Sequence, residues 1–371
     1  MKFHTTSDNL ALQAQAIAGA LGDNRNVPAT SHILVIAKEG MISLFATDLE
    51  VELRTSFPAL IEVEGRIAVP GKKFIEIVKD MDNEEVVVEV AANNTMSLFY
   101  NRFRSTISCL PASDFPQLKA PAFDSFANLN GAALAQMLRQ VTPSICTDET
   151  KFSLCGANIT VDGGIMKVAS TNGHRLTVAE RDLSVPDGIF RSAVTIPRKG
   201  VSEIRKLAES APDKSLRFGI NDNTAFLAAG DVGLAIRLVN DNFPEYSRVI
   251  PGSEGRKIVV PREQLLRSLK RVAILSEAKT KRVKFLFSHG KIVVETNTAG
   301  VGESVAELMV DYADEPREMY LNGKYVQEAL ESLDKEEKIH ISLHGIGQPI
   351  TVKSIENRGY LAVIMPMRGD A

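Results

Sequence analysis

The chain has 371 residues, a formal net charge of −3, and 44% hydrophobic against 24% charged residues, which is ordinary for a globular protein of two or three domains. No apolar run approaches the ~20 residues that a membrane-spanning helix needs, and the N-terminal residues lack the basic and apolar regions of a secretory signal, so we expect neither. The three cysteines are scattered and form no CxxC pair, which favours free thiols in a cytoplasmic protein over a zinc site or disulfides.

Amphipathic helices are expected in three pairs along the chain. Apolar residues recur at the spacing of one helix face in six segments, namely 7–21, 71–80, 131–141, 197–209, 261–275 and 323–333. The sequence between them alternates or clusters β-branched and aromatic residues, as in VVVEV, MSLFYN and VKFLFSHGKIVVETN, and is broken by Gly, Asn and Asp. This pattern is typical of antiparallel strands. Each pair of helices is therefore predicted to pack on an antiparallel sheet, which makes the fold class α+β.

The same order of elements recurs with a period near 125 residues. A polar turn residue follows the first helix of each unit and stands at Asp48, Asn172 and Asn297. A lysine near the start of the second helix stands at Lys73, Lys199 and Lys324. Markers that agree on one step over the whole length predict a tandem repeat. We therefore expect three tandem copies of one domain, at 1–120, 127–250 and 255–371.

Positive charge is concentrated in the predicted helices. The six segments hold 13 basic and 8 acidic residues, so they carry +5 while the rest of the chain carries −8. For a single helix, charged residues are most simply a solvated face, but the same bias summed over six related helices favours a shared basic surface. Lysines and arginines with few aromatic neighbours are suited to phosphate contacts that ignore base sequence, and not to base stacking on single strands.

Two other interpretations remain open. Asp48, Glu50 and Glu52 alternate on a predicted strand, as the carboxylates of a two-metal nuclease would. Apolar residues fill the opposite face, so the acids are more simply explained as the solvent-facing side of a half-buried sheet. His174 has no partner nucleophile at a defined spacing, and the sequence holds no GxxxxGK[ST] phosphate-binding loop, so we expect no enzyme, no cofactor and no metal. The other interpretation is a monomeric repeat scaffold that binds proteins only.

Several motifs, in this order and at this spacing, resemble the β sliding clamp family, the processivity subunits of bacterial DNA polymerase III. They are ATDLEVEL (46–53), LPASDFP (110–116), STNGHRL (170–176), IPRKG (196–200), NFPEYSRVIP (242–251) and IMPMR (364–368), and the likeness covers essentially the whole chain. The resemblance implies DNA-clamp domains in a head-to-tail homodimeric ring that encircles duplex DNA and slides on it. It also implies short apolar peptides through which the replicative polymerase, the clamp loader and other replication and repair proteins bind.

Helix dimensions agree with a ring of two chains. Helices are about 10 Å across, so six of them around a circle leave a hole of about 10 Å and twelve leave roughly 28 Å. Only the larger hole accepts a duplex, whose radius exceeds the ~8.5 Å depth of its major groove. Contacts between different surfaces of identical chains close into a ring when the rotation permits.

The resemblance assigns roles to individual residues. A partner-peptide pocket between the second and third domains would use Leu154, Thr171, Gly173, His174, Arg175, Leu176, Pro244, Arg248, Val249, Tyr325, Val363, Ile364, Met365, Pro366, Met367 and Arg368. The DNA contacts would be Arg25, Lys73, Lys151 and Lys199, to which the charge of the fifth helix adds Arg271. The dimer interface would be Phe103, Ser105, Ile274 and Leu275. The chain departs from the family pattern at Asp148, where an uncharged DNA-touching residue can stand, at Ser105, where a large apolar one can, and in the tail after Arg368.

Overall fold

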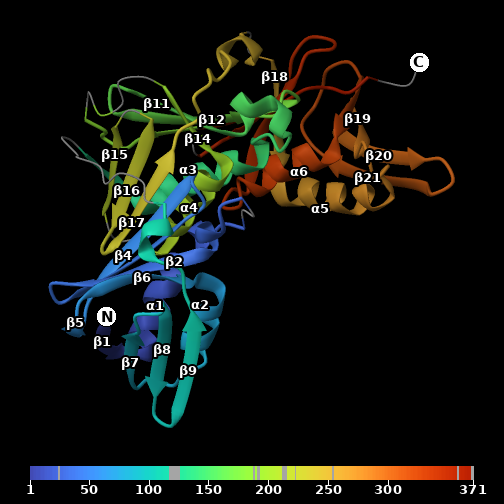
Figure 1. Cartoon of the computed structure of the whole chain (residues 1–371). Helices are drawn as coiled ribbons and strands as arrows, with labels where there is room; N and C mark the ends of the chain where they lie inside the picture. Colours follow the sequence, from blue (N-terminus) through green and yellow to red (C-terminus); the bar gives the residue numbers. More distant parts are fainter. Residues whose placement is uncertain are drawn as a thin grey trace. The chain divides into compact units, whose positions relative to one another are not determined.

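The computed structural model describes residues 1–23, 26–116, 126–186, 189, 193–210, 215–221, 223–252, 255–356 and 359–368 (Figure 1). The chain splits into two compact units. Unit 1 holds Met1–Ala132 with Lys199–Leu238, and unit 2 holds Ala133–Arg198 with Val239–Ala371. Both units combine helices with antiparallel sheets, as the α+β prediction requires. Within the described ranges, no helix is both long and apolar enough to cross a bilayer.

Unit 1 contains two antiparallel sheets. The smaller has five strands, which in spatial order are β5 (Leu60–Val63), β1 (Lys2–Thr6), β7 (Glu85–Val90), β8 (Thr95–Tyr100) and β9 (Phe103–Ser108). The larger has eight, in the order β10 (Ala127–Asn130), β15 (Ser215–Asn221), β16 (Thr224–Ala229), β17 (Val232–Arg237), β4 (Val51–Pro58), β3 (Met41–Thr47), β2 (His32–Lys38) and β6 (Gly65–Pro70). Strands β17 and β4 pair with Leu234 opposite Leu53, so the first two predicted repeats share one continuous sheet.

Helices pack on these sheets through apolar faces. Helix α1 (Ser7–Ala16) begins where the Thr6 hydroxyl accepts a hydrogen bond from the Asn9 amide at 3.4 Å. It buries Leu10 and lies beside α2 (Gly71–Lys79), which buries Phe74. Unit 1 also holds nearly all of α4 (Arg198–Ser210) and the 3₁₀ turns η1 (Ala18–Ala20), η2 (Pro28–Ser31) and η3 (Ala112–Asp114).

Unit 2 repeats this plan. Its eight-stranded sheet runs β14 (Val194–Pro197), β11 (Gly156–Asp162), β12 (Ile165–Thr171), β13 (Arg175–Asp182), β25 (Tyr360–Ile364), β24 (Ile350–Ser354), β23 (Lys338–Leu343) and β18 (Arg256–Pro261). Its four-stranded sheet runs β21 (Gly302–Met309), β20 (Lys291–Thr298), β19 (Arg282–Ser288) and β22 (Arg317–Asn322). Strands β13 and β25 join the second and third predicted repeats in the same way.

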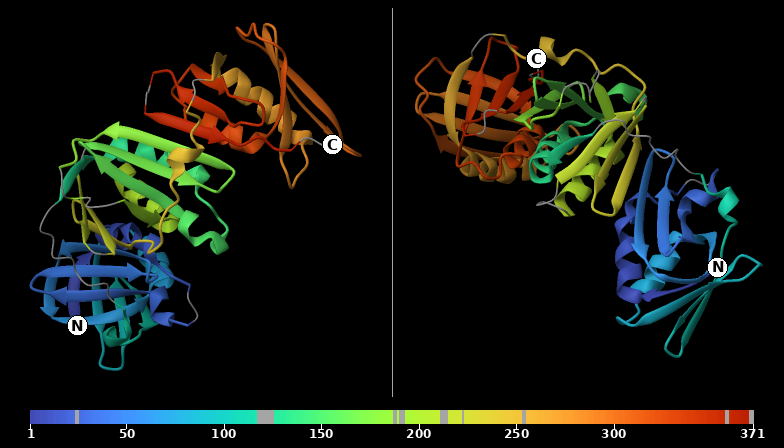
Figure 2. Two further views of the ribbon diagram at one scale, coloured as in Figure 1. Left: turned by 90° about the horizontal axis from the view of Figure 1, so that it is seen from above. Right: turned by 90° about the vertical axis from the view of Figure 1, so that its left-hand side faces the viewer.

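Unit 2 holds most of α3 (Gly131–Val141), α5 (Arg262–Val272) and α6 (Gly323–Glu331), with the 3₁₀ turns η4 (Thr142–Ser144), η5 (Glu149–Leu154), η6 (Tyr246–Val249) and η7 (Ala273–Leu275). Helix α5 lies beside α6 and contacts both β18 and β20 (Figure 2). Leu265 and Val326 share one buried core with Phe285 and Ile341, so strands from both sheets enclose the helices.

All six predicted helices are confirmed, and the first is shorter than expected because it ends at Ala16 before a 3₁₀ turn. Two of the three repeat markers form the same turn. The amides of Glu50 and Val51 donate to Asp48 Oδ1 at 3.0 and 2.8 Å, and the amides of His174 and Arg175 donate to Asn172 Oδ1 at 3.0 and 3.2 Å. The third marker is wrong as a turn residue, because Asn297 lies within β20, opposite Glu303. There the hairpin turns later, at Gly300.

Candidate functional site

The turn that joins β12 to β13 is held by its own side chains. The Thr171 hydroxyl donates to the Arg175 carbonyl at 2.6 Å and accepts from the Gly173 amide at 3.1 Å. Gly173 has a φ of +88°, a conformation that L residues rarely adopt. Asn172 was not among the predicted pocket residues. Its side-chain oxygen accepts hydrogen bonds from the amides of His174 and Arg175 within the turn. The motif STNGHRL therefore places His174 on the exposed side of the turn and Arg175 on the buried side.

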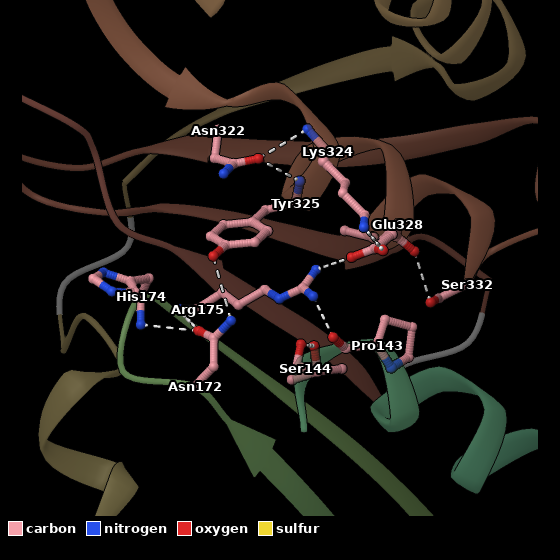
Figure 3. Close-up of polar contacts among 12 residues, drawn as sticks. Pro143, Ser144, Asn172, His174, Arg175, Asn322, Lys324, Tyr325, Glu328 and Ser332 are labelled. Atoms are coloured by element: carbon pink, nitrogen blue, oxygen red, sulfur yellow. Dashed lines mark hydrogen bonds and ion pairs between the residues drawn. The ribbon is translucent and has the colours of Figure 1, made fainter. Parts of the chain in front are cut away.

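Arg175 is buried inside unit 2 and is engaged through the two terminal nitrogens of its guanidinium. Its guanidinium makes an ion pair with Glu328 of α6 and donates to the Pro143 carbonyl of η4 (Figure 3). The guanidinium carbon lies 4.2 Å from the centre of the Tyr325 ring, a cation–π arrangement. The side chain joins β13 to α6, and the pocket role that the resemblance implies for Arg175 stays a prediction.

Tyr325 connects this cluster to the start of α6. The side chain of Asn322 caps the helix by accepting from the amides of Lys324 and Tyr325 at 3.0 and 3.3 Å. The Tyr325 hydroxyl accepts from the Asn172 side chain at 3.4 Å, so the helix and the β12–β13 turn are linked directly (Figure 3). Tyr360 of β25 lies beneath, and burial raises the pKa of its hydroxyl.

An apolar cluster lies next to the turn, on the face of the eight-stranded sheet opposite the helices. Leu176 and Val363 are cross-strand partners and are 1% exposed. Residues that the prediction missed pack over this floor, namely Phe243, Tyr246, Ile250 and Leu361. Three of the four belong to the segment NFPEYSRVI, where apolar residues recur three or four positions apart, so the sequence carried a signal of one shared face.

The C-terminal residues continue from this floor. The Met365 amide donates to the His174 carbonyl at 3.0 Å, and the Met367 amide donates to the Tyr320 carbonyl at 2.7 Å. Met365 is 41% exposed, and Val249 at the end of η6 is 50% exposed. Exposed methionine is a flexible, polarizable apolar surface that can adapt to different partners.

The structure therefore brings most of the predicted pocket residues into one region of unit 2. Hydrogen bonds and strand pairing link Thr171, Gly173, His174, Leu176, Val363, Ile364 and Met365, and Met367 follows two residues after Met365. The remaining residues flank them on nearby elements. Leu154 ends η5 half-buried, Pro244 and Arg248 are exposed, Pro366 is half-buried, and Arg368 is the last described residue. The guanidinium of Arg248 pairs with Glu245 at 2.6 Å, and the tail after Arg368 lies outside the described residues.

The predicted DNA-contacting residues differ in how accessible their charges are. Arg25 lies outside the described residues. Lys73, Lys151 and Arg271 are exposed, and Lys73 pairs with Glu76 at 2.8 Å. Lys199 is half-buried and makes an ion pair with Asp48, the turn residue of unit 1.

Asp148 serves a local structural role. Its carboxylate caps η5 by accepting from the amide and the hydroxyl of Thr150 at 3.1 and 2.7 Å, and these hydrogen bonds lower its pKa.

The predicted dimer residues lie at sheet edges. Phe103 and Ser105 are in β9, the edge strand of the five-stranded sheet, and Phe103 is 49% exposed. Ile274 and Leu275 form η7 next to β21, the edge strand of the four-stranded sheet. Ile274 is 78% exposed although it is a large apolar residue. Unpaired edges with exposed apolar side chains are suited to pairing with another chain.

The predicted alternation of Asp48, Glu50 and Glu52 on one strand is wrong. Asp48 precedes β4 and forms the turn, with Leu49 next to it at a φ of +81°. Glu52 is buried within β4, and burial raises the pKa of Glu50. No group of three His, Cys, Asp or Glu among the described residues is arranged to hold a metal ion.

Comparisons with known proteins agree over the full length of the chain. The family described as DNA polymerase III beta subunit matches with its N-terminal domain at residues 1–119, its central domain at 128–245 and its C-terminal domain at 247–368. The beta sliding clamps of Vibrio cholerae and Escherichia coli K12 are each 27% identical over 99% of this chain and 100% of their own.

Solved structures give the same result. The DNA polymerase sliding clamp of Pseudomonas aeruginosa, solved with a ligand, superposes with a TM-score of 0.93 at 27% identity and covers 100% of both chains. The sliding clamp of Bartonella birtlesii, solved bound to griselimycin, has a TM-score of 0.93 at 28% identity and the same coverage. By its three consecutive domain matches, the chain belongs to the DNA polymerase III beta subunit family.

Proposed function

We propose that this chain is a DNA polymerase processivity factor, a sliding clamp that acts in the cytoplasm as a head-to-tail homodimeric ring around duplex DNA. The observation that carries the proposal is family membership through three consecutive domain matches, from residue 1 to residue 368. Each chain supplies three clamp domains, at 1–120, 127–250 and 255–371. The protein performs no catalysis. It holds the replicative polymerase on DNA by encircling the duplex.

Two sheet edges support closure of the ring. Strand β9 of one chain would pair with β21 of the other, because each is the edge strand of its own sheet. The edges also have opposite charge, with Arg104 in β9 and with Glu303 and Glu307 in β21. Exposed Phe103 and Ile274 add apolar area, and complementary charge favours this pairing over contact between like edges.

The apolar cluster beside the β12–β13 turn supports the partner site. Its buried floor of Leu176 and Val363 is bordered by the exposed side chains of Val249 and Met365. Such a surface suits a short apolar peptide, as in helix or strand recognition by preformed grooves. The replicative polymerase, the clamp loader and other replication and repair proteins would use this site in turn. Arg175 holds the site together from behind through its ion pair with Glu328.

The helices support contact with the DNA backbone. Phosphate contacts hold the protein near the duplex without fixing its position, so the ring can slide. The exposed Arg271 of α5 and Lys73 of α2 are the clearest candidates. Lys199 would contact phosphate only by exchanging its Asp48 partner for the DNA, so its contribution is smaller than that of Arg271.

The decisive experiment asks whether the protein is retained on DNA by topology. The protein is first sized by light scattering, where we expect a dimer. It is then loaded onto nicked circular DNA with its clamp loader and ATP, and the circle is cut with a restriction enzyme. Retention on the circle and loss from the linear product are expected. A monomer at micromolar concentration, or equal retention on both forms of DNA, would contradict the ring and favour a scaffold that binds proteins only.

A further inference from the structure

Two of the three cysteines lie beside each other in unit 2, at the two ends of the loop that contains η5. Both are free thiols; Cys146 is 4% exposed and Cys155 is half-buried. The Cys146 amide donates to the carbonyl of Leu154, the residue before Cys155, at 3.1 Å. This hydrogen bond holds the two backbones side by side at the base of the loop. We call residues 146–155, all of which the structure describes, the thiol loop.

The two sulfurs of the thiol loop share one hydrogen-bond acceptor. The carbonyl oxygen of Asp148 lies 3.2 Å from the Sγ atom of Cys155 and 3.8 Å from the Sγ atom of Cys146. Burial, and after it the neighbouring Cys146 thiol, raises the pKa of the Cys155 thiol above its ordinary value. Two thiols that reach the same oxygen come within bonding distance by side-chain rotation and a small adjustment of the loop between them.

The backbone of the thiol loop permits such an adjustment. At its C-terminal end, the Cys155 carbonyl accepts from the Arg198 amide at the start of α4, at 3.0 Å. In its middle, the Lys151 amide donates to the Asp148 carbonyl at 3.0 Å. Lys151 itself has a non-helical conformation, with φ −103° and ψ 56°, so η5 is two short turns and not one continuous helix. The loop can therefore adjust at Lys151 while Cys155 stays bound to α4.

We propose that Cys146 and Cys155 form a redox modification site, at which a peroxide converts the two thiols into a reversible intrachain disulfide. Hydrogen peroxide oxidises the more accessible sulfur, that of Cys155, to a sulfenic acid, and one water molecule is released. The Cys146 sulfur then attacks the Cys155 sulfur, so that the S–S bond forms, the S–O bond breaks and a second water molecule leaves. Two thiols and one peroxide give one disulfide and two water molecules. The buried Cys146 reacts without contact with solvent.

The disulfide closes the thiol loop covalently and makes η5 more rigid. A crosslink removes open conformations of the loop between its ends. Because η5 carries Lys151 and Leu154, oxidation restrains one predicted DNA contact and one predicted pocket residue together. The raised pKa of Cys155 keeps its thiol protonated near neutral pH, so the reaction is slow and responds to sustained exposure to peroxide. Disulfides of proteins in reducing compartments are typically transient in this way.

The test uses the full chain, which is reduced with dithiothreitol, freed of reductant and treated with a modest excess of hydrogen peroxide at mildly alkaline pH. Maleimide labelling under denaturing conditions counts the free thiols, and mass spectrometry of unreduced peptides identifies the linked residues. We expect the count to fall from three to one with a link between Cys146 and Cys155, and dithiothreitol to reverse both changes. Hydrogen exchange across residues 147–154 should be several-fold slower in the oxidised protein.

Variants separate the roles of the two sulfurs. Cys146→Ala should leave the sulfenic acid of Cys155 without a partner thiol, so that dimedone traps it. Cys155→Ser should leave Cys146 as a free thiol, because Cys146 is buried. Cys109→Ser is the matched control, since Cys109 lies in unit 1, and this variant should form the disulfide as the unaltered chain does. Thermal unfolding checks that each variant is folded.

Several outcomes would overturn the redox site. Three free thiols after treatment of protein that stays folded would do so, as would a link between two chains on a non-reducing gel. Oxidation of Cys155 to a sulfinic acid while Cys146 remains a thiol would also overturn it. A disulfide that leaves hydrogen exchange across residues 147–154 unchanged would overturn its effect on η5. Retention of the reduced protein on circular DNA is independent of these results.

Discussion

The buried pair of Arg175 and Glu328 gives the sharpest prediction about stability. Replacing Arg175 with Met removes the guanidinium that pairs with Glu328 and donates to the Pro143 carbonyl. Breaking a buried ion pair by removing one partner costs about 3–5 kcal/mol. The Glu328 side chain is 23% exposed and lies 3.8 Å from the Lys324 ammonium, so we expect the lower part of that range, about 3 kcal/mol.

Urea denaturation followed by circular dichroism measures this loss, which is roughly a hundredfold in the folding equilibrium of the affected unit. The double variant Arg175→Met with Glu328→Met should be more stable than Arg175→Met alone, because two apolar side chains leave no buried charge unpaired. Lys73→Met breaks an exposed pair instead and should leave the urea midpoint almost unchanged. A loss below ~1 kcal/mol for Arg175→Met, or a double variant less stable than the single one, would show that the pair is not an unpaired-charge problem once broken.

Four further predictions concern binding and reactivity. Deleting Met365–Ala371 should abolish binding of the replicative polymerase peptide in an anisotropy assay while the far-UV spectrum and the dimer persist; unchanged affinity would show that the pocket lies elsewhere. Arg271→Glu should reduce loading onto DNA more at low salt than at high salt, and more than Lys199→Glu does, since Lys199 already has an acidic partner. Ile274→Ala with Leu275→Ala should shift the dimer toward monomer in sedimentation, and an unshifted profile would place the interface on other residues. Burial raises the pKa of Cys109 to about 11, so its alkylation in the folded protein should stay slow until the pH approaches that value, while the unfolded chain reacts readily near pH 9; equal rates in both states at pH 9 would contradict this.

The sequence predicted most of the local structure. Helix periodicity placed all six helices, and the alternation of apolar residues predicted antiparallel sheets between them. The spacing of Asp48 and Asn172 predicted a repeat whose two turns share the same hydrogen bonds, because an Asx side chain that caps the amides two and three residues later is a local feature. Asn297 failed as the third marker since hairpin length depends on the pairing of β20 with β21, which no single residue specifies.

The roles of particular charges could not be predicted from the sequence. Arg175 and Glu328 stand 153 positions apart, and Lys199 and Asp48 stand 151 apart. Neither ion pair can therefore be predicted from the spacing of residues along the chain. The family resemblance implies a peptide contact for Arg175 and a DNA contact for Lys199, and both stay predictions. Only the fold shows that one is buried beneath Tyr325 and that the other is paired.

The helices, the repeat and the family resemblance can be predicted from local sequence, because periodicity, turn chemistry and motif order depend on residues close together in the chain. Which surfaces are continuous depends on the folded structure. Cross-strand pairing places Lys257, Ser342, Thr351, Val363 and Leu176 in one row that draws on five strands from residues 175 to 364, and the order of this row depends on sheet register. Register is set by long-range pairing and by burial of one sheet face, so a basic residue and an apolar floor that are far apart in the chain become neighbours only in the folded protein.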